Sequence, residues 1–404
     1  TPLEGVRVLD LTHHIAGPHC TKILADWGAD VLKIERPPGG DPSRQYGPFH
    51  KDDPHPEKSA LFLHLNTNKR SMTLNLKSAE GRSIVERLLP EFDIVVENFR
   101  PGVMDSLGLG YQTLAAQNPR IILTSISNFG QTGPYRDLKA SEITEFAMGG
   151  PMNVNGHREH FPLKLGGNVV QYQAGGVAAY ATLLALWQVE MHGAEGQHND
   201  ISIYETQAGF RDRRTTYLVA HAYGGEIGRR PETAVRPGLG IRPCKDGYVN
   251  IYVTSGEKMK KFLSMIGRED LLSDPRTDAG MMLGAMYPDL GEEIEASYLG
   301  WLMERGKLEA ATIAQEHTLL AAPVNTVADL LNDPSYRERG FFETIDHPAT
   351  GPLTYPGRPF IMNDSPRPLA RRAPLLGEHT KEVLCGRLGY SDEDLTKLRA
   401  QGVI

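Results

Sequence analysis

The chain has 404 residues, of which 40% are hydrophobic and 23% charged, with a formal net charge of −7. This length predicts two or three domains, each able to bury a core, in an ordinary globular protein. The negative balance argues against a nucleic-acid partner held by bulk positive charge, although a few cations in one cleft suffice for a small anionic ligand.

The N-terminal half alternates strand and helix patterns. Predicted strands cover 6–11, 28–35, 93–97 and 121–125, and predicted helices cover 19–27 and 79–89. Such alternation predicts an α/β fold with a doubly wound, mostly parallel, Rossmann-like sheet. Binding of NAD or FAD would require G-x-G-x-x-G after the first strand, and Thr12–Pro18 lacks that pattern.

The segment from Leu165 to Val189 contains no charged residue. Its strongly apolar part, Ala174–Trp187, is shorter than a membrane span, so we expect a buried core helix and no membrane partner. An Arg-, Gly- and Pro-rich connector follows at 211–243. The predicted organisation is a large domain at 1–210, a smaller α/β domain at 225–325, and a return segment at 330–404 that completes the large domain.

Cysteine and histidine spacing indicates no metal. Cys20, Cys244 and Cys385 form no C-x-x-C pair, so neither a zinc site nor a disulfide framework is expected. The histidines also lack metal-site spacing. Low cysteine usage, and an N-terminal segment that runs straight into a strand pattern, predict a cytoplasmic location.

Segments spread over nearly the whole chain resemble the family III CoA-transferases, also called the CaiB/BaiF family. They are 3–10, 24–36, 68–71, 97–102, 127–135, 193–197, 323–324, 333–334 and 373–380. Each match is weak alone, but their common order is specific. The resemblance implies a two-domain chain interlocked with a homologous subunit, with an active site between the large domain and the partner's small domain.

The same resemblance implies a set of coenzyme A contacts. The positions that match are Ile15, Ala16, Arg36, Leu74, Lys77, Asn98, Phe99, Arg100 and Lys139. Their chemistry fits the ligand, because CoA carries phosphates that favour Arg or Lys and a flat base that favours apolar walls.

The central departure from the family is Gln171. The family has an aspartate there, whose carboxylate attacks the acyl-CoA thioester and becomes a mixed anhydride, whereas an uncharged carboxamide cannot serve as that nucleophile. Glu142 matches an acidic residue that assists the aspartate, and Glu145 is expected on the helix surface. Cys20 is expected to be buried and inert, and the Tyr172 hydroxyl is a poor acyl acceptor.

Three functions therefore remain open. The chain is a CoA-transferase subunit that works with an Asp-bearing partner on a donor such as succinyl-CoA, as in the heteromeric benzylsuccinate and malate enzymes of the family. Alternatively, it is a homodimeric acyl-CoA enzyme of different chemistry or one using Glu142, or a non-catalytic acyl-CoA-binding protein. The family's glycine loop corresponds to Gly238–Gly240, with fewer glycines.

Overall fold

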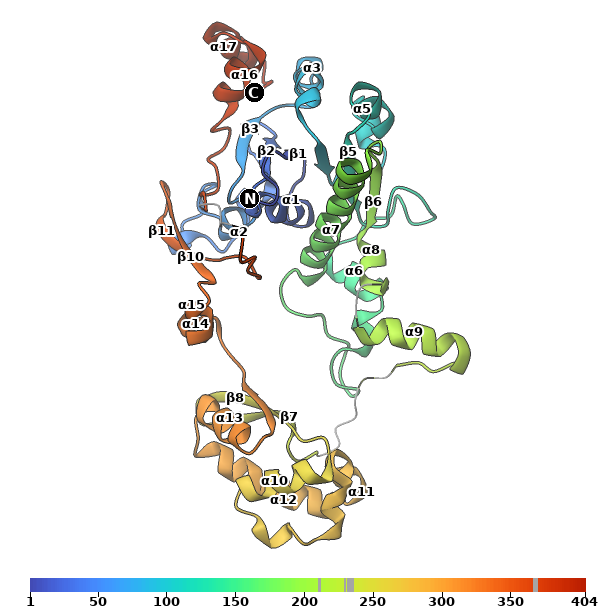
Figure 1. Ribbon diagram of the computed structural model, residues 1–404, viewed down its shortest axis with the longest axis vertical. Helices are drawn as coiled ribbons and strands as arrows, with labels where there is room; N and C mark the ends of the chain where they lie inside the picture. The colour runs from blue at the N-terminus through green and yellow to red at the C-terminus, as the bar shows by residue number, and fades with distance from the viewer. Residues whose placement is uncertain (210–211, 229, 231–235, 366–369) are drawn as a thin grey trace. The chain divides into compact units, whose positions relative to one another are not determined.

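The computed structural model describes residues 1–209, 212–228, 230, 236–365 and 370–404 (Figure 1). It divides into two compact units, and each is described by itself. The first combines 1–156, 160–230 and 341–404, and the second combines 157–159 and 231–340. The segment predicted as a small domain, 225–325, overlaps the second unit, and the predicted return segment, 330–404, begins inside it.

The first unit is built on a six-stranded sheet in the order β3-β2-β1-β4-β5-β6. The strands are β1 Arg7–Asp10, β2 Asp30–Glu35, β3 Arg70–Thr73, β4 Ile94–Glu97, β5 Ile122–Ser127 and β6 His198–Ser202. Every neighbouring pair in this sheet is parallel. This is the strand order of a doubly wound sheet, which confirms the predicted fold class.

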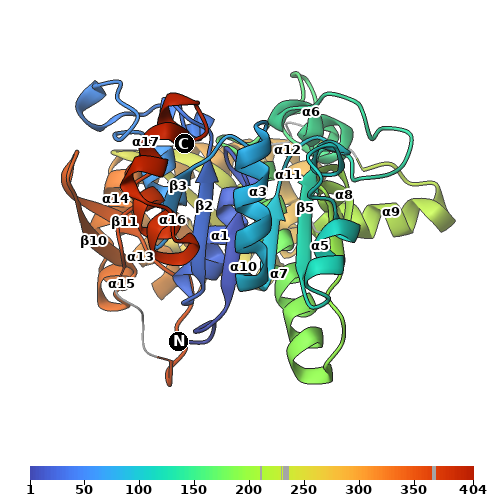
Figure 2. The ribbon, with the colours of Figure 1, turned by 90° about the horizontal axis from the view of Figure 1, so that it is seen from above.

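Helices cover both faces of the sheet. On one face lie α1 Ala16–Asp26, α6 Glu142–Met148, α7 Val169–His192 and α8 Ile203–Gly209, and on the other lie α3 Ala79–Leu88, α5 Tyr111–Gln117, α16 Thr380–Leu388 and α17 Asp392–Ala400 (Figure 2). Successive strand residues alternate between the two cores, so that Val8 packs with α1 and α7 while Leu9 packs with α3 and α16. The remaining elements of this unit are α2 Ala60–Leu65, α4 Val103–Ser106, α9 Asp212–Gly224, β10 Phe342–His347 and β11 Gly351–Pro356.

A glycine sets how closely α7 approaches α1. A Cβ atom added to Gly175 would lie 2.4 Å from the carbonyl oxygen of Ala16 and 3.0 Å from the Cβ of His19. A larger residue would therefore push the two helices apart. The first turn of α7 lies beside the loops after β4 and β5, since Gln171, Asn98 and Asn128 line one cavity.

Helix α7 extends beyond the predicted apolar stretch on both sides. Within the part of the chain that the structure describes, it is the one helix long and apolar enough to cross a membrane by length and composition, and 44% of its most apolar stretch is buried. One face packs against α1, β5 and β6. The opposite face exposes Tyr180, Leu184, Trp187 and Met191, which follow one another at helical spacing.

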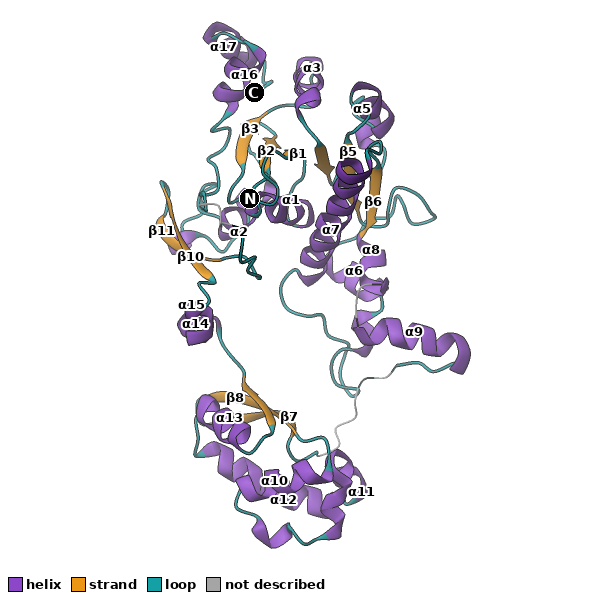
Figure 3. Ribbon diagram, in the orientation of Figure 1, coloured by secondary structure: helices purple, strands orange, loops and turns teal. Residues whose placement is uncertain are grey.

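The second unit is mostly helical and carries a three-stranded antiparallel sheet (Figure 3). Its strands are β7 Leu239–Cys244, β8 Gly247–Tyr252 and β9 Leu320–Pro323, and its helices are α10 Gly256–Met265, α11 Leu283–Met286, α12 Pro288–Met303, α13 Lys307–Glu316, α14 Val327–Asn332 and α15 Pro334–Glu338. Val249, Phe262 and Tyr298 are fully buried in its core. Gly238 and Gly240, with φ of 66° and 96°, turn the chain at the start of β7.

Candidate active site

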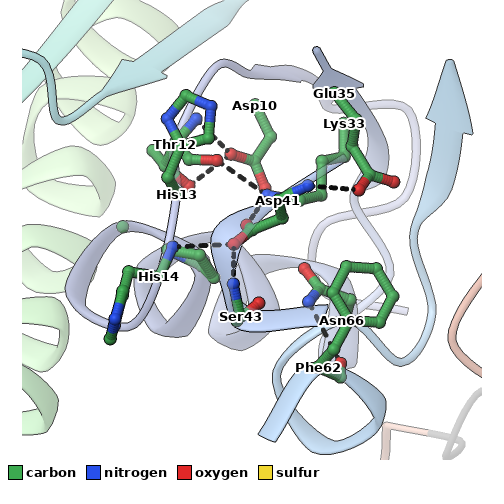
Figure 4. A network of polar contacts seen from close by, with 12 residues as sticks. Asp10, Thr12, His13, His14, Lys33, Glu35, Asp41, Ser43, Phe62 and Asn66 are labelled. Carbon is green, nitrogen blue, oxygen red and sulfur yellow. Dashed lines mark hydrogen bonds and ion pairs between the residues drawn. The ribbon is translucent and has the colours of Figure 1, made fainter. Parts of the chain in front are cut away.

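Buried ion pairs fix the loops that follow β1 and β2 (Figure 4). Lys33 Nζ lies 2.8 Å from Asp41 Oδ2, and both side chains are fully buried. Asp41 Oδ1 also accepts hydrogen bonds from the backbone N–H groups of His14 and Ser43. Burial alone would raise the pKa of Asp41, but the Lys33 ammonium and these donors hold it at about 2. The carboxylate is therefore ionised, and it ties the loop after β1 to the loop after β2.

A second buried pair holds the rest of the loop after β2. The guanidinium of Arg44 donates to both oxygens of Glu35 over 2.7 and 2.9 Å, and its third nitrogen donates to Glu57 over 2.7 Å. The guanidinium also lies 3.6 Å from the centroid of the Phe62 ring. Such bidentate pairing is geometrically specific, so it gives the loop a defined shape next to the sheet.

Asn98, at the end of β4, joins the loop after β1. Its amide nitrogen donates to the His13 carbonyl over 2.8 Å, and its amide oxygen accepts from the His13 N–H over 2.8 Å. The side chain predicted to contact CoA therefore braces a loop of the site, while the neighbouring Phe99 packs its ring 5.6 Å from the His13 ring.

The loops enclose a cavity of about 1030 Å³ at the carboxyl ends of β1, β2, β3 and β4. In doubly wound sheets, ligands bind in the crevice where the strand order reverses, which here lies between β1 and β4. Of the predicted contacts, this switch-point cavity contains Arg36, Leu74, Lys77, Asn98, Phe99 and Arg100. The exposed cations Arg36 and Lys77 stand beside the buried Leu74, which is an arrangement suited to a phosphate and a flat base.

A second cavity of about 590 Å³ contains Gln171 and Lys139. It shares Asn98, Phe99, Arg100 and Val103 with the switch-point cavity, so one continuous wall runs from Arg36 to Gln171. We call this second cavity the Gln171 cavity. Ile15 and Ala16 line neither cavity: they are 2% and 1% exposed where α1 begins, and the structure does not bring them to the other predicted contacts.

Two carboxylates surround the first turn of α7. Glu142 Oε1 accepts from the Val170 N–H over 3.1 Å, and Glu142 Oε2 accepts from the Gln171 N–H over 3.2 Å. Lys164 Nζ lies 3.5 Å from Glu142 Oε1. A carboxylate at a helix N-terminus satisfies unpaired N–H groups and interacts favourably with the helix dipole. Glu142 therefore caps α7 and holds Gln171 in place.

Glu145 is fully buried behind Gln171, so the prediction that it lies on a helix surface is wrong. Gln171 Nε2 donates to Glu145 Oε2 over 2.9 Å. In the amide orientation that satisfies both of its ends, Asn128 donates to Glu145 Oε1 over 3.0 Å and accepts from the Ala140 N–H over 3.2 Å. Burial, together with the nearby Glu142 charge, raises the pKa of Glu145 to about 7.

The other nucleophile candidates are structural. Cys20 is fully buried, and burial raises the pKa of its thiol to about 12, so the thiolate is scarce near neutral pH. Tyr172 packs against the His19 ring at a centroid distance of 4.8 Å, and burial raises the pKa of its hydroxyl. Among the described residues, no cluster of three or more His, Cys, Asp or Glu side chains has the arrangement of a metal site.

Several residues that line the two cavities were not predicted as ligand contacts from the sequence. His13, His14 and Gln45 line the switch-point cavity, and Arg136 lines the Gln171 cavity. The signal for the two histidines was their place directly after the first strand, where doubly wound folds put ligand loops. Asn128 follows β5 in the same way.

Comparison with known proteins assigns the chain to a family. The model of "CoA-transferase family III" matches residues 3–380. The chain belongs to this family. It is 34% identical to a formyl-CoA:oxalate CoA-transferase of Bradyrhizobium sp., over 100% of this chain and 97% of the relative. It is 32% identical to a succinyl-CoA–D-citramalate CoA-transferase of Chloroflexus aurantiacus, over 100% of this chain and 98% of the relative.

The solved structures agree with this family III assignment. A CaiB/BaiF family protein from Brucella suis matches with a TM-score of 0.83 and 30% sequence identity, covering 96% of this chain and 99% of that one. The resemblance inferred from the ordered motifs is thus confirmed. Family membership supports CoA transfer in general, with CoA thioesters and carboxylic acids as the substrate classes.

Proposed function

We propose that the chain is a CoA-transferase subunit that binds an acyl-CoA along the wall from Arg36 to Gln171. CoA would move from a donor such as succinyl-CoA to a carboxylic acid in a homologous partner subunit, whose aspartate at the matching position would attack the thioester bound there, while this chain would bind acyl-CoA without attacking it. The observation that carries this proposal is the shared wall of the two cavities, with exposed cations at one end and position 171 at the other.

The wall suits the parts of an acyl-CoA in order. Arg36 and Lys77 stand where the phosphates of the nucleotide end need positive charge. Phe99 and Val103 border both cavities and offer an apolar path for the pantetheine arm. The thioester would then lie in the Gln171 cavity, close to the residue that occupies the family's aspartate position.

The need for a partner follows from the chemistry of the residues at the Gln171 end of the wall. The Gln171 amide is no nucleophile, and the oxygens of Glu142 are engaged by two backbone N–H groups and by Lys164. Hydrogen bonds of this kind stabilise the carboxylate and reduce its tendency to attack. The exposed apolar face of α7, to which Trp187 and Met191 belong, would offer such a partner a surface to pack on.

A second candidate is acyl-CoA chemistry by this chain alone. It is favoured by Glu145, whose carboxyl group titrates near pH 7 directly behind the cavity. In that case a homodimer would process acyl-CoA without forming an anhydride at position 171.

The test compares the CoA-transfer activity of the chain alone with its activity in the presence of a partner. The chain is expressed alone and together with an Asp-bearing homologue from the same genome, and CoA transfer from succinyl-CoA to carboxylic acids is followed by chromatography. We expect activity only from the co-purified pair, with hydroxylamine-sensitive acylation confined to the homologue. Turnover by the chain alone, with acylation at Glu142 or Glu145, supports the second candidate and rejects the partner. Failure of the chain to bind any CoA thioester rejects both.

A further inference from the structure

The Gln171 amide is held in one orientation by its surroundings. Its nitrogen donates to Glu145 Oε2 over 2.9 Å. Its oxygen, Oε1, has no hydrogen-bond partner among the residues that the structure describes, and the side chain lines the Gln171 cavity. The inner half of the amide is thus satisfied, and the outer half is open to a ligand.

The reason for this orientation is the charge of Glu145. An ionised carboxylate can only accept hydrogen bonds, so each amide beside it must turn its N–H₂ group inward. Gln171 does so for one carboxylate oxygen, and Asn128 does so for the other in the amide orientation that satisfies both of its ends. Both ends of the Asn128 amide make hydrogen bonds, whereas the carbonyl oxygen of the Gln171 amide makes none. A carbonyl oxygen accepts hydrogen bonds and does not donate them.

We propose that Glu145 is a positioning residue that presents Gln171 Oε1 to the cavity as an acceptor, so that the site selects acyl-CoA thioesters bearing a hydroxyl group near the thioester. This inference rests on the proposed function only in placing the thioester beside Gln171. A site built to bond a hydroxyl group discriminates against the analogue that lacks one, because the bound thioester would exclude water from the acceptor and leave it unpaired.

Protonation of Glu145 should weaken this preference. A protonated carboxyl group has an O–H donor, so it can bond Gln171 Oε1 and free the amide to turn. Helix α6 packs against α7 and α8 and follows the loop after β5. The titratable groups on α6 and these segments include Glu142, Lys164 just before α7, Tyr172 on α7, Tyr204 and Glu205 on α8, and Arg136, Asp137 and Lys139 on the loop. Glu142 is the neighbouring charge that raises the pKa of Glu145.

The test measures the ratio of two affinities by titration calorimetry. The probes are 3-hydroxybutyryl-CoA and butyryl-CoA, and the proteins are the full-length wild type, Glu145→Gln and Gln171→Leu, each from pH 6 to 8.5. The wild type should prefer the hydroxyl probe about threefold to tenfold at pH 8, and less at pH 6. Gln171→Leu should lose the preference, and Glu145→Gln should show a smaller preference that does not change with pH.

Glu190→Gln is the matched control, because it removes an exposed carboxylate of α7 that lines neither cavity. It should keep both the preference and its dependence on pH. A merely structural role for Glu145 would leave the wild-type pH profile in the Glu145→Gln variant, which would overturn the proposal. Equal affinity of the wild type for both probes would also overturn it. Binding of neither probe would instead reject the proposed function.

Discussion

Replacing Gln171 by aspartate tests whether this site tolerates the family's nucleophile. The new carboxylate would stand opposite Glu145, whose Oε2 atom is 2.9 Å from Gln171 Nε2. Aspartate is one methylene shorter, so the two charges would be roughly 4 Å apart and would repel by about 4 kcal/mol at an effective dielectric constant near 20. That repulsion raises the pKa of Glu145 by about 3 further units.

Near neutral pH, a proton kept on Glu145 would remove most of this repulsion. The pKa of Glu145 is already about 7 in the unchanged chain. One pH unit corresponds to about 1.4 kcal/mol. The coupling between Gln171→Asp and Glu145 should therefore be near zero at pH 6, about 1.4 kcal/mol at pH 8 and about 3 kcal/mol at pH 9.

A double-mutant cycle measures this coupling. Urea unfolding is recorded at pH 6, 8 and 9 for the wild type, Gln171→Asp, Glu145→Gln and the double variant, which exchanges the carboxylate and the amide. The double variant should also trap more acyl-enzyme with acyl-CoA and hydroxylamine at pH 7 than Gln171→Asp alone. In the single variant, protonated Glu145 would donate a hydrogen bond to the new carboxylate and make it a weaker nucleophile. Coupling that is absent at pH 9, or that does not change with pH, would refute the reasoning.

Three other outcomes follow from the contacts. Arg36→Ala should weaken binding of CoA thioesters by about tenfold to a hundredfold in calorimetry, whereas Arg120→Ala, which breaks an exposed pair with Glu190, should leave it unchanged. Burial lowers the pKa of His64 to about 3, so only the unfolded chain takes up a proton below about pH 6.5, and stability is lost as the pH falls. His64→Gln should remove about 2 kcal/mol of the loss between pH 6.5 and 5 in urea unfolding. Trp187→Lys should reduce self- or partner association in size-exclusion chromatography while the circular dichroism spectrum stays unchanged, and unchanged association would exclude the α7 face as an interface.

The sequence determined the fold class because central parallel strands are apolar on both faces. Runs such as those of β1 and β4 are buried on both sides, and their alternation with helices predicted the doubly wound sheet. Within the six-stranded sheet, the pattern missed β3 and β6, which are its edge strands. Their polar residues find partners far along the chain, as Arg70 does with Asp30 and Glu382, and no local pattern reports such pairs.

The sequence also determined the family, because the family depends on residue type and order, and the same motifs predict that Gln171 stands at the position of the family's nucleophile. Only the tertiary structure decided the state of Glu145. Its neighbours Asn128 and Gln171 come from the loop after β5 and from α7. The three-residue spacing between Glu142 and Glu145 fits a solvated helix face equally well. The pKa of a carboxyl group depends on how many water contacts it loses and which charges remain nearby, and both are set by the packing of α6 against α7 and α8.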